Sequence, residues 1–245
     1  MSDTLAAWRN RDRAEDLIGQ IDAALGRGEI DESGWHERVA DIIRPAYLAG
    51  ATPQAQSGFS AAGAGAPGRV ATVAWWHARG ILAAAIDREG TFLDVGCANG
   101  LLMETLTAWS AAKGTAIEPY GLDIVNALAE LARQRLPHWA DRIFVGNALS
   151  WTPPRRFDFV RTGVDYVPPR RRRDLIERLL RDVVAPRGRL IIGVYTDGDP
   201  RRSSLREAIE DSGFVVAGSV ERAHRIRTNE LQRVLWIDAN GTYSQ

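Results

Sequence analysis

The sequence predicts an α/β fold: a seven-stranded, mostly parallel sheet with an antiparallel last strand, helices on both faces and a helical segment before it. Short apolar runs separated by stretches of helical apolar spacing are typical of a parallel sheet covered on both sides. Five such runs lie at 92–96, 120–125, 142–147, 157–163 and 189–196. Two further runs, 214–222 and 230–239, have no full helix between them and therefore predict an antiparallel hairpin.

The first 49 residues have apolar side chains near a 3.6-residue period, which predicts helices. The first helix should end at Gly26 and Gly28. The second should begin at Ser33, whose hydroxyl is suited to cap it, and should be disturbed at Pro45.

Residues 50–68 have no periodicity and are rich in Gly, Ala and Pro, which is typical of a linker or loop. A further helix is expected from about 70 to 86. We therefore expect a helical lid with its linker at 1–68 and the main domain at 69–245.

Composition excludes several classes of protein. The chain of 245 residues has 31 acidic and 31 basic side chains, so its balanced charge gives no reason to expect nucleic acid as a partner. One cysteine and four scattered histidines predict neither a disulfide framework nor a metal site. No apolar run is long enough for a membrane span, and the charged N-terminal residues do not fit a signal peptide. We expect a cytoplasmic protein.

The first strand of the predicted sheet ends in a glycine-rich turn, Leu93 to Gly100, that leads directly into a helix. Such a turn lets a ligand approach the backbone and the amides of the helix N-terminus. It is not a dinucleotide fingerprint, because Ala98 and Leu101 stand where that pattern needs glycine. It is not a P-loop either, because no Gly-Lys-Ser/Thr follows.

The order hydrophobic-Asp-x-Gly-x-Gly/Ala-x-Gly in this turn resembles motif I of the class I S-adenosylmethionine (SAM)-dependent methyltransferases. The resemblance covers most of residues 70–239. It implies the seven-stranded fold, SAM as cofactor, S-adenosylhomocysteine (SAH) as product, and methyl transfer as the reaction. Ala98 departs from the usual glycine, although a methyl group fits there at some cost in room.

The resemblance also implies roles for residues at the strand ends. The 96–100 turn would lie under the methionine and ribose of SAM, with Asp94 near the ammonium. Asp123 would accept both ribose hydroxyls, since its two oxygens face two vicinal donors, and Asn147 would bind adenine. The complete cofactor set is Asp94, Gly96, Cys97, Ala98, Asn99, Gly100, Asp123, Ile124, Asn147, Ala148, Leu149 and Thr162.

Methyl transfer needs mainly positioning, and a base only when the acceptor must lose a proton. Asp165 and Tyr166, after the fourth strand, are the first candidates, although Asp165 also fits a solvated turn. His77 is the third candidate, beside Trp75 and Trp76. These two tryptophans cannot both face one core, so at least one should have another partner, either the N-terminal helices or an apolar substrate. Core packing is favoured over contact with a substrate. Tyr195 and His224 are weaker candidates.

The leading functional hypothesis is methyl transfer to a small-molecule acceptor, with secondary metabolism as its setting. An RNA or protein methyltransferase and a SAM-binding protein without activity stay open as alternatives, as does a homodimer. The arginine run 170–173 does not favour RNA, because acidic residues four positions away make it a solvated helix face. The N-terminal helices fit either a lid or an interaction surface.

Overall fold

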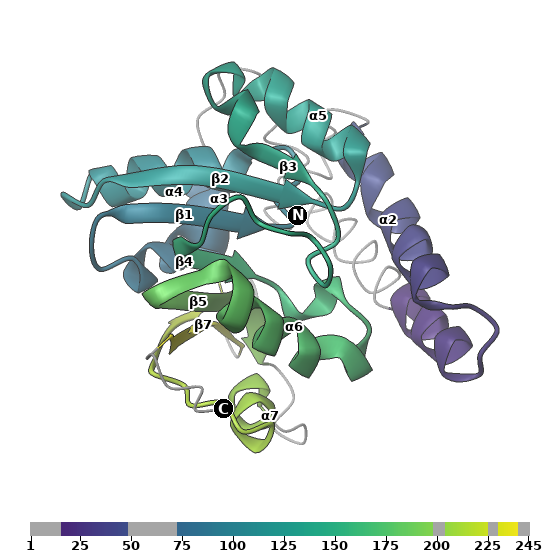
Figure 1. Ribbon diagram of the computed structural model, residues 1–245. Coiled ribbons are helices and arrows are strands. Elements are labelled where there is room, and N and C mark those ends of the chain that lie inside the picture. The colour runs from purple at the N-terminus through teal and green to yellow at the C-terminus, as the bar shows by residue number, and fades with distance from the viewer. Residues whose placement is uncertain (1–15, 49–72, 198–203, 225–229, 240–245) are drawn as a thin grey trace.

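The computed structural model describes residues 16–48, 73–197, 204–224 and 230–239 (Figure 1). The expected linker at 50–68 lies outside these residues, as do Leu5 and Trp8 of the first expected helix. The described residues form one seven-stranded sheet with helices packed around it, in the strand order β3-β2-β1-β4-β5-β7-β6.

Neighbouring strands pair in parallel from β3 across to β5, whereas β7 is antiparallel to both β5 and β6. This confirms the predicted sheet, including its terminal hairpin. The strands are β1 Gly90–Val95, β2 Ile117–Asp123, β3 Ile143–Val145, β4 Phe157–Thr162, β5 Val184–Asp197, β6 Gly218–Ala223 and β7 Leu231–Asp238.

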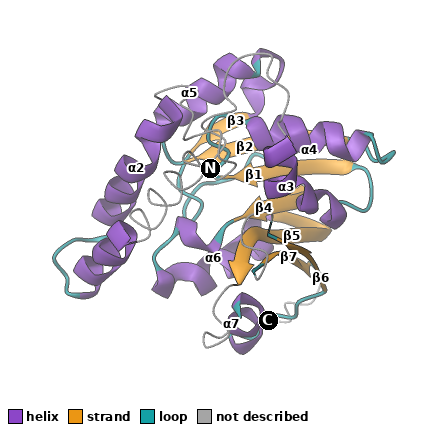
Figure 2. Ribbon diagram, turned by 180° about the vertical axis from the view of Figure 1, so that it is seen from behind, coloured by secondary structure: helices purple, strands orange, loops and turns teal. Residues whose placement is uncertain are grey.

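Both faces of the sheet are covered, as Figure 2 shows from behind. Adjacent residues of β1 belong to different apolar clusters: Leu93 packs in the cluster of α6, and Phe92 in that of α3 and α4. This alternation follows from the period of two in a strand. The helices are α3 Val73–Arg79, α4 Leu101–Ala111, α5 Asn126–Arg135, α6 Arg172–Arg178 and α7 Leu205–Asp211.

Two details of these helices differ from expectation. The helix expected from 70 to 86 is α-helical only to Arg79 and continues as a 3-10 helix over Gly80–Ala85. A Cβ on Gly80 would lie 2.3 Å from the Trp76 ring, so glycine is needed at this junction. Helix α7 was not expected at all, although Ser204 and Glu207 form a capping box at its start.

Trp75 and Trp76 face different surroundings, as expected for adjacent helical residues. Trp75 is buried, and its Nε1 donates to Thr105 Oγ1 at 3.0 Å. Trp76 is 42% exposed, and its ring packs edge-on against that of Trp109 in α4, with 4.9 Å between the ring centroids. The partner of the second tryptophan is therefore α4.

The N-terminal residues form a helical hairpin: residues 16–26 are helical and α2 spans Glu32–Leu48. The cap of α2 is Asp31, whose Oδ1 accepts the Gly34 amide at 2.8 Å, so the expected cap at Ser33 was wrong by two positions. Pro45 does not end the helix, which continues to Leu48. Ile21, Leu25, Trp35 and Val39 give the hairpin a small core of its own.

The hairpin lies at the edge toward which β1 and β2 point (Figure 1). Glu32 pairs with Arg170 at 3.3 Å and with Arg171 at 3.7 Å, in the segment after β4. At the other end of α2, Tyr47 packs against the apolar cluster that contains Trp75. The carboxyl ends of the strands are thus flanked by α2.

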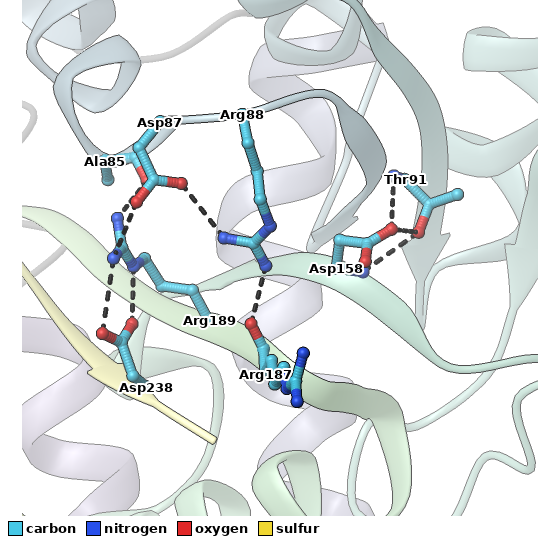
Figure 3. A network of polar contacts seen from close by, with 8 residues as sticks. All are labelled: Ala85, Asp87, Arg88, Thr91, Asp158, Arg187, Arg189 and Asp238. Atoms are coloured by element: carbon cyan, nitrogen blue, oxygen red, sulfur yellow. Dashed lines mark hydrogen bonds and ion pairs between the residues drawn. The ribbon is translucent and has the colours of Figure 1, made fainter. Parts of the chain in front are cut away.

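The opposite edge of the sheet is held by a network of arginines (Figure 3). Arg189 of β5 pairs with Asp238 at 2.7 Å and with Asp87 at 3.0 Å, and donates to Ala85 O at 2.9 Å. An open hollow of about 450 Å³ lies at this edge, lined by residues that include Glu118 and Asp158. Because the network joins the end of the 3-10 helix to β5 and β7, it fixes the direction in which the chain enters β1.

Candidate functional site

The turn after β1 is held by backbone bonds to the neighbouring strand. The amides of Gly96 and Cys97 both donate to Leu122 O, at 2.7 and 3.1 Å. Gly96, Ala98 and Gly100 all have positive φ, at 75°, 48° and 73°. The turn therefore folds back on itself and brings the N-terminus of α4 to the carboxyl edge of the sheet, where ligands of open α/β sheets bind.

Ala98 occupies the left-handed region that favours glycine. For an L-residue this conformation costs roughly 1–2 kcal/mol. The Ala98 amide donates to Asp123 Oδ2 at 2.9 Å, a contact between the turn and the end of β2. This bond helps to hold the strained conformation.

Asp123 is buried, with 6% of its surface exposed, and each of its oxygens already accepts a backbone amide. Oδ2 accepts from Ala98, and Oδ1 from Val125 at 2.8 Å. Burial raises the pKa of this carboxyl, and the two amide bonds oppose that rise. Because each carboxylate oxygen accepts two hydrogen bonds, one position stays open on each. The anchoring of the turn by Asp123 was not expected from the sequence.

The end of β3 lies beside Asp123, since the Gly146 amide donates to Asp123 O at 2.9 Å. Asn147 Oδ1 accepts the Leu149 amide at 2.9 Å and so shapes its own turn. The Asn147 NH₂ group and a second lone pair on its oxygen are left for a ligand. Two apolar side chains at these strand ends, Ile124 and Val145, are about 40% exposed.

Arg161 of β4 is the group that sequence reasoning missed. It lies opposite Asp94 in the register of β1 and β4. Its Nε donates to Gly193 O at 2.7 Å, and its Nη1 to Asp94 Oδ1 at 3.2 Å and to the Tyr166 hydroxyl at 2.8 Å. The one signal in the sequence is a charged residue inside the apolar run 157–163.

Two buried groups around Arg161 have raised pKa values. Burial raises the pKa of Asp94 to about 6, against the opposing effect of Arg161. Burial also raises the pKa of Tyr166, so its phenol stays protonated at neutral pH. Because the Tyr166 oxygen accepts from Arg161, its own proton is free to be donated. Tyr166 is suited to donate a hydrogen bond and not to act as a base.

The Tyr166 ring lies directly over the turn. A Cβ on Gly96 would be 2.6 Å from its Cε2, and one on Gly163 would be 3.1 Å from its Cε1. Asp165 is exposed beside it, and the fully buried Thr162 donates its hydroxyl hydrogen to Gly163 O at 3.1 Å. The structure thus brings Tyr166, but not the Thr162 side chain, to the surface of the turn.

Arg79 of α3 adds a second cation to this region. Its guanidinium lies 5.5 Å from the Trp75 ring centroid, and Nη1 donates to Ala78 O at 3.1 Å. Burial lowers the pKa of Arg79, and the charge of Arg161 lowers it further. Tyr47, Tyr166 and Asp165 lie close enough to oppose these effects.

His77 and Cys97 were also expected at the site, as a catalytic candidate and as a cofactor-binding residue. No hydrogen bond, ion pair or ring contact joins the His77 imidazole to another residue in the described ranges, whereas the His77 carbonyl accepts from Arg222. The Cys97 side chain is buried in the cluster of Met103 and Ala129, where burial raises the pKa of its thiol. Only the backbone of Cys97 faces the turn, and Asn99 Oδ1 caps the Leu101 amide at 3.2 Å.

Among the described residues, no group of three or more His, Cys, Asp or Glu side chains is placed to hold a metal ion. The same residues include no helix long and apolar enough to cross a bilayer.

Neither a protein-family model nor a curated protein matches the chain. Solved structures with a similar fold include the cyclase SpnF, at 16% identity and a TM-score of 0.49 over 65% of this chain and 78% of that one. A 1,6-didemethyltoxoflavin-N1-methyltransferase from Burkholderia thailandensis is 19% identical, with a TM-score of 0.48 over 66% and 76%. Geranyl diphosphate C-methyltransferase from Streptomyces coelicolor is 15% identical, with a TM-score of 0.48 over 66% and 78%. At these values, activity and substrate must be argued from the chain's own residues.

Proposed function

We propose that the protein is a SAM-dependent methyltransferase that acts on a small-molecule acceptor. The observation that carries this proposal is the bond between the Ala98 amide and Asp123 Oδ2. It joins a motif I turn to an acid at the end of the next strand, at the edge where Asn147 also lies. A glycine-rich turn by itself fits many α/β proteins, but this joint arrangement fits a nucleoside lying across three strand ends.

The chemistry of these residues fits the cofactor. Asp123 keeps one acceptor position on each oxygen for the two ribose hydroxyls. Asn147 can both donate and accept at the edge of adenine, while Ile124 and Val145 offer exposed apolar surface to the purine. Asp94 is the buried carboxylate closest to the start of the turn. Burial disfavours its ionised form, and the ammonium of the cofactor would stabilise that form.

When bound, SAM supplies a methyl carbon that bonds to a lone pair of the acceptor while the carbon–sulfur pair returns to sulfur, leaving SAH. The chain's own contribution is to hold the acceptor in line with that methyl group and to exclude water. Tyr166 lies over Gly96 and can orient the acceptor by donating its hydroxyl hydrogen. A proton on the acceptor oxygen or nitrogen would have to leave to Asp165 or to solvent.

The α2 hairpin is proposed as a lid over the acceptor. It flanks the strand ends, and its Tyr47 lies near Arg79 and Tyr166. Deleting residues 1–60 should largely preserve SAH binding and abolish transfer, because the hairpin has an apolar core of its own. Full transfer by the shortened protein would refute the lid.

The test of the proposed function has two steps. Calorimetry with SAH measures binding, and labelled SAM with pooled acceptors measures transfer and SAH release. Binding with transfer to small molecules is expected. Binding without SAH release for any acceptor would favour a SAM-binding protein without activity, and label in RNA or protein would favour the macromolecular alternative. Lack of SAH binding would contradict the proposal as a whole.

A further inference from the structure

Two guanidinium groups lie in this site, and the described residues engage only one of them in an ion pair. They belong to Arg79 and Arg161, and the charge of Arg161 lies close enough to lower the pKa of Arg79. Only one carboxylate, Asp94, makes an ion pair with either of them in the described parts of the chain. Asp123 is engaged with backbone amides on the ribose side, and Asp165 is exposed to solvent. Arg79 is therefore left without an ion-pair partner among the residues that the structure describes.

Both guanidinium groups also keep unused donors. The bonds of Arg161 use Nε and Nη1, so its Nη2 donates to no described residue. Arg79 donates only from Nη1, to the carbonyl of Ala78. The Arg79 plane is supported by the Trp75 ring. Planar, supported guanidinium groups with free N–H groups are what carboxylate recognition requires.

We propose that Arg79 and Arg161 form an anion subsite at the acceptor side of the turn, and that the acceptor is an organic acid whose carboxylate binds there. This inference rests on the proposed function, because it names the acceptor of that reaction. The cofactor adds no net negative charge to the site, because its carboxylate and ammonium cancel and its sulfonium adds a positive charge. An acid supplies the missing negative charge beside the sulfonium.

The position of the subsite agrees with this assignment. Arg161 reaches from β4 to Gly193 of β5, away from the nucleoside side of the sheet at β2 and β3. Tyr47 of α2 and Tyr166 lie around Arg79, so the proposed lid and the Tyr166 hydroxyl both face the same region. An acid bound here would lie between the turn and α2.

Benzoate and benzamide test the proposal, because they share a shape and differ in charge. The full-length protein is saturated with SAH, and the affinity for each probe is measured by calorimetry. Benzoate is expected to bind at least about tenfold more tightly than benzamide. Arg79→Met should abolish that preference, whereas Arg206→Met, on the exposed surface of α7, should keep it. Arg161→Met is a second variant, and loss of the preference in it supports the proposal.

Three results would overturn the proposal. Equal binding of the two probes would exclude an anion subsite, and a preference that survives Arg79→Met would place it elsewhere. Competition between benzoate and SAH would assign Arg79 to the carboxylate of the cofactor. The titrations are also carried out without SAH. If the protein does not bind SAH, the proposed function is contradicted, but the comparison of benzoate and benzamide in the Arg79 variant still decides whether the anion subsite exists.

Discussion

Replacing Asp123 by asparagine tests the centre of the candidate cofactor site. The side chain keeps its shape, but one of its two acceptor oxygens becomes an NH₂ group. Either the Ala98 or the Val125 amide then loses its acceptor in a buried place, since Asp123 is only 6% exposed. A buried amide without a partner costs about 1–3 kcal/mol, so the free energy of unfolding should fall by that amount without any cofactor.

The same change should weaken SAH binding, because one ribose hydroxyl loses a charged acceptor. Hydrogen bonds to charged groups contribute about 1.5–3 kcal/mol, which corresponds to a roughly ten- to hundredfold loss of affinity. Calorimetry would compare SAH with its analogue lacking the 2′-hydroxyl. The native protein should bind SAH more tightly than the analogue, and Asp123→Asn should reduce that difference.

The comparison of the two ligands separates ribose binding from damage to the turn. A distorted turn weakens both ligands equally, whereas a lost ribose contact weakens SAH more than the analogue. If the native protein does not distinguish the ligands, or if Asp123→Asn distinguishes them as well as the native protein does, Asp123 does not contact the ribose.

Three further predictions concern other residues of the candidate cofactor site. Asn147→Ala should weaken SAM and SAH by the same factor in calorimetry, because both carry adenine; a loss confined to SAM would place Asn147 near the sulfonium. The pKa of Asp94 is raised from 3.8 to about 6, so the folded protein holds this proton more tightly than the unfolded chain does. The resulting contribution to the free energy of unfolding is complete below pH 3.8 and is lost as the pH rises through 6. SAH affinity should change in the opposite sense, falling below pH 6 as the carboxylate protonates, and titrations of Asp94→Asn should lack this dependence. Ala98→Gly should raise the free energy of unfolding in denaturant by about 0.5–1 kcal/mol, because the cost of positive φ is relieved and the conformational entropy of glycine offsets part of that gain. Ala108→Gly, at an exposed position of α4, should lower the free energy of unfolding by about 1 kcal/mol.

The sheet and the meeting of the candidate cofactor residues at one edge could be predicted from the sequence, because their signals are local. Apolar runs of strand length alternate with helical spacing, and parallel strands end at a common edge. Residues just after successive runs, such as Gly96, Asp123 and Asn147, must therefore come together. Local signals are less sharp at helix ends, where Asp31 and Ser33 are both good caps and only the fold selects Asp31.

The cluster of charged residues around Arg161 was decided by tertiary structure alone. Asp94 and Arg161 are 67 residues apart, and only the register of β1 against β4 places them opposite each other. Arg79 reaches the same place because α3 packs beside the sheet, although nothing in its own segment distinguishes it from a surface arginine. Buried charged residues depend on partners from distant segments of the chain. An apolar pattern in the sequence predicts that a position is buried, but not which charged groups surround it. The sequence by itself thus determined which strand ends form the candidate site, and the packing of β1, β4 and α3 determined the charged groups beside it.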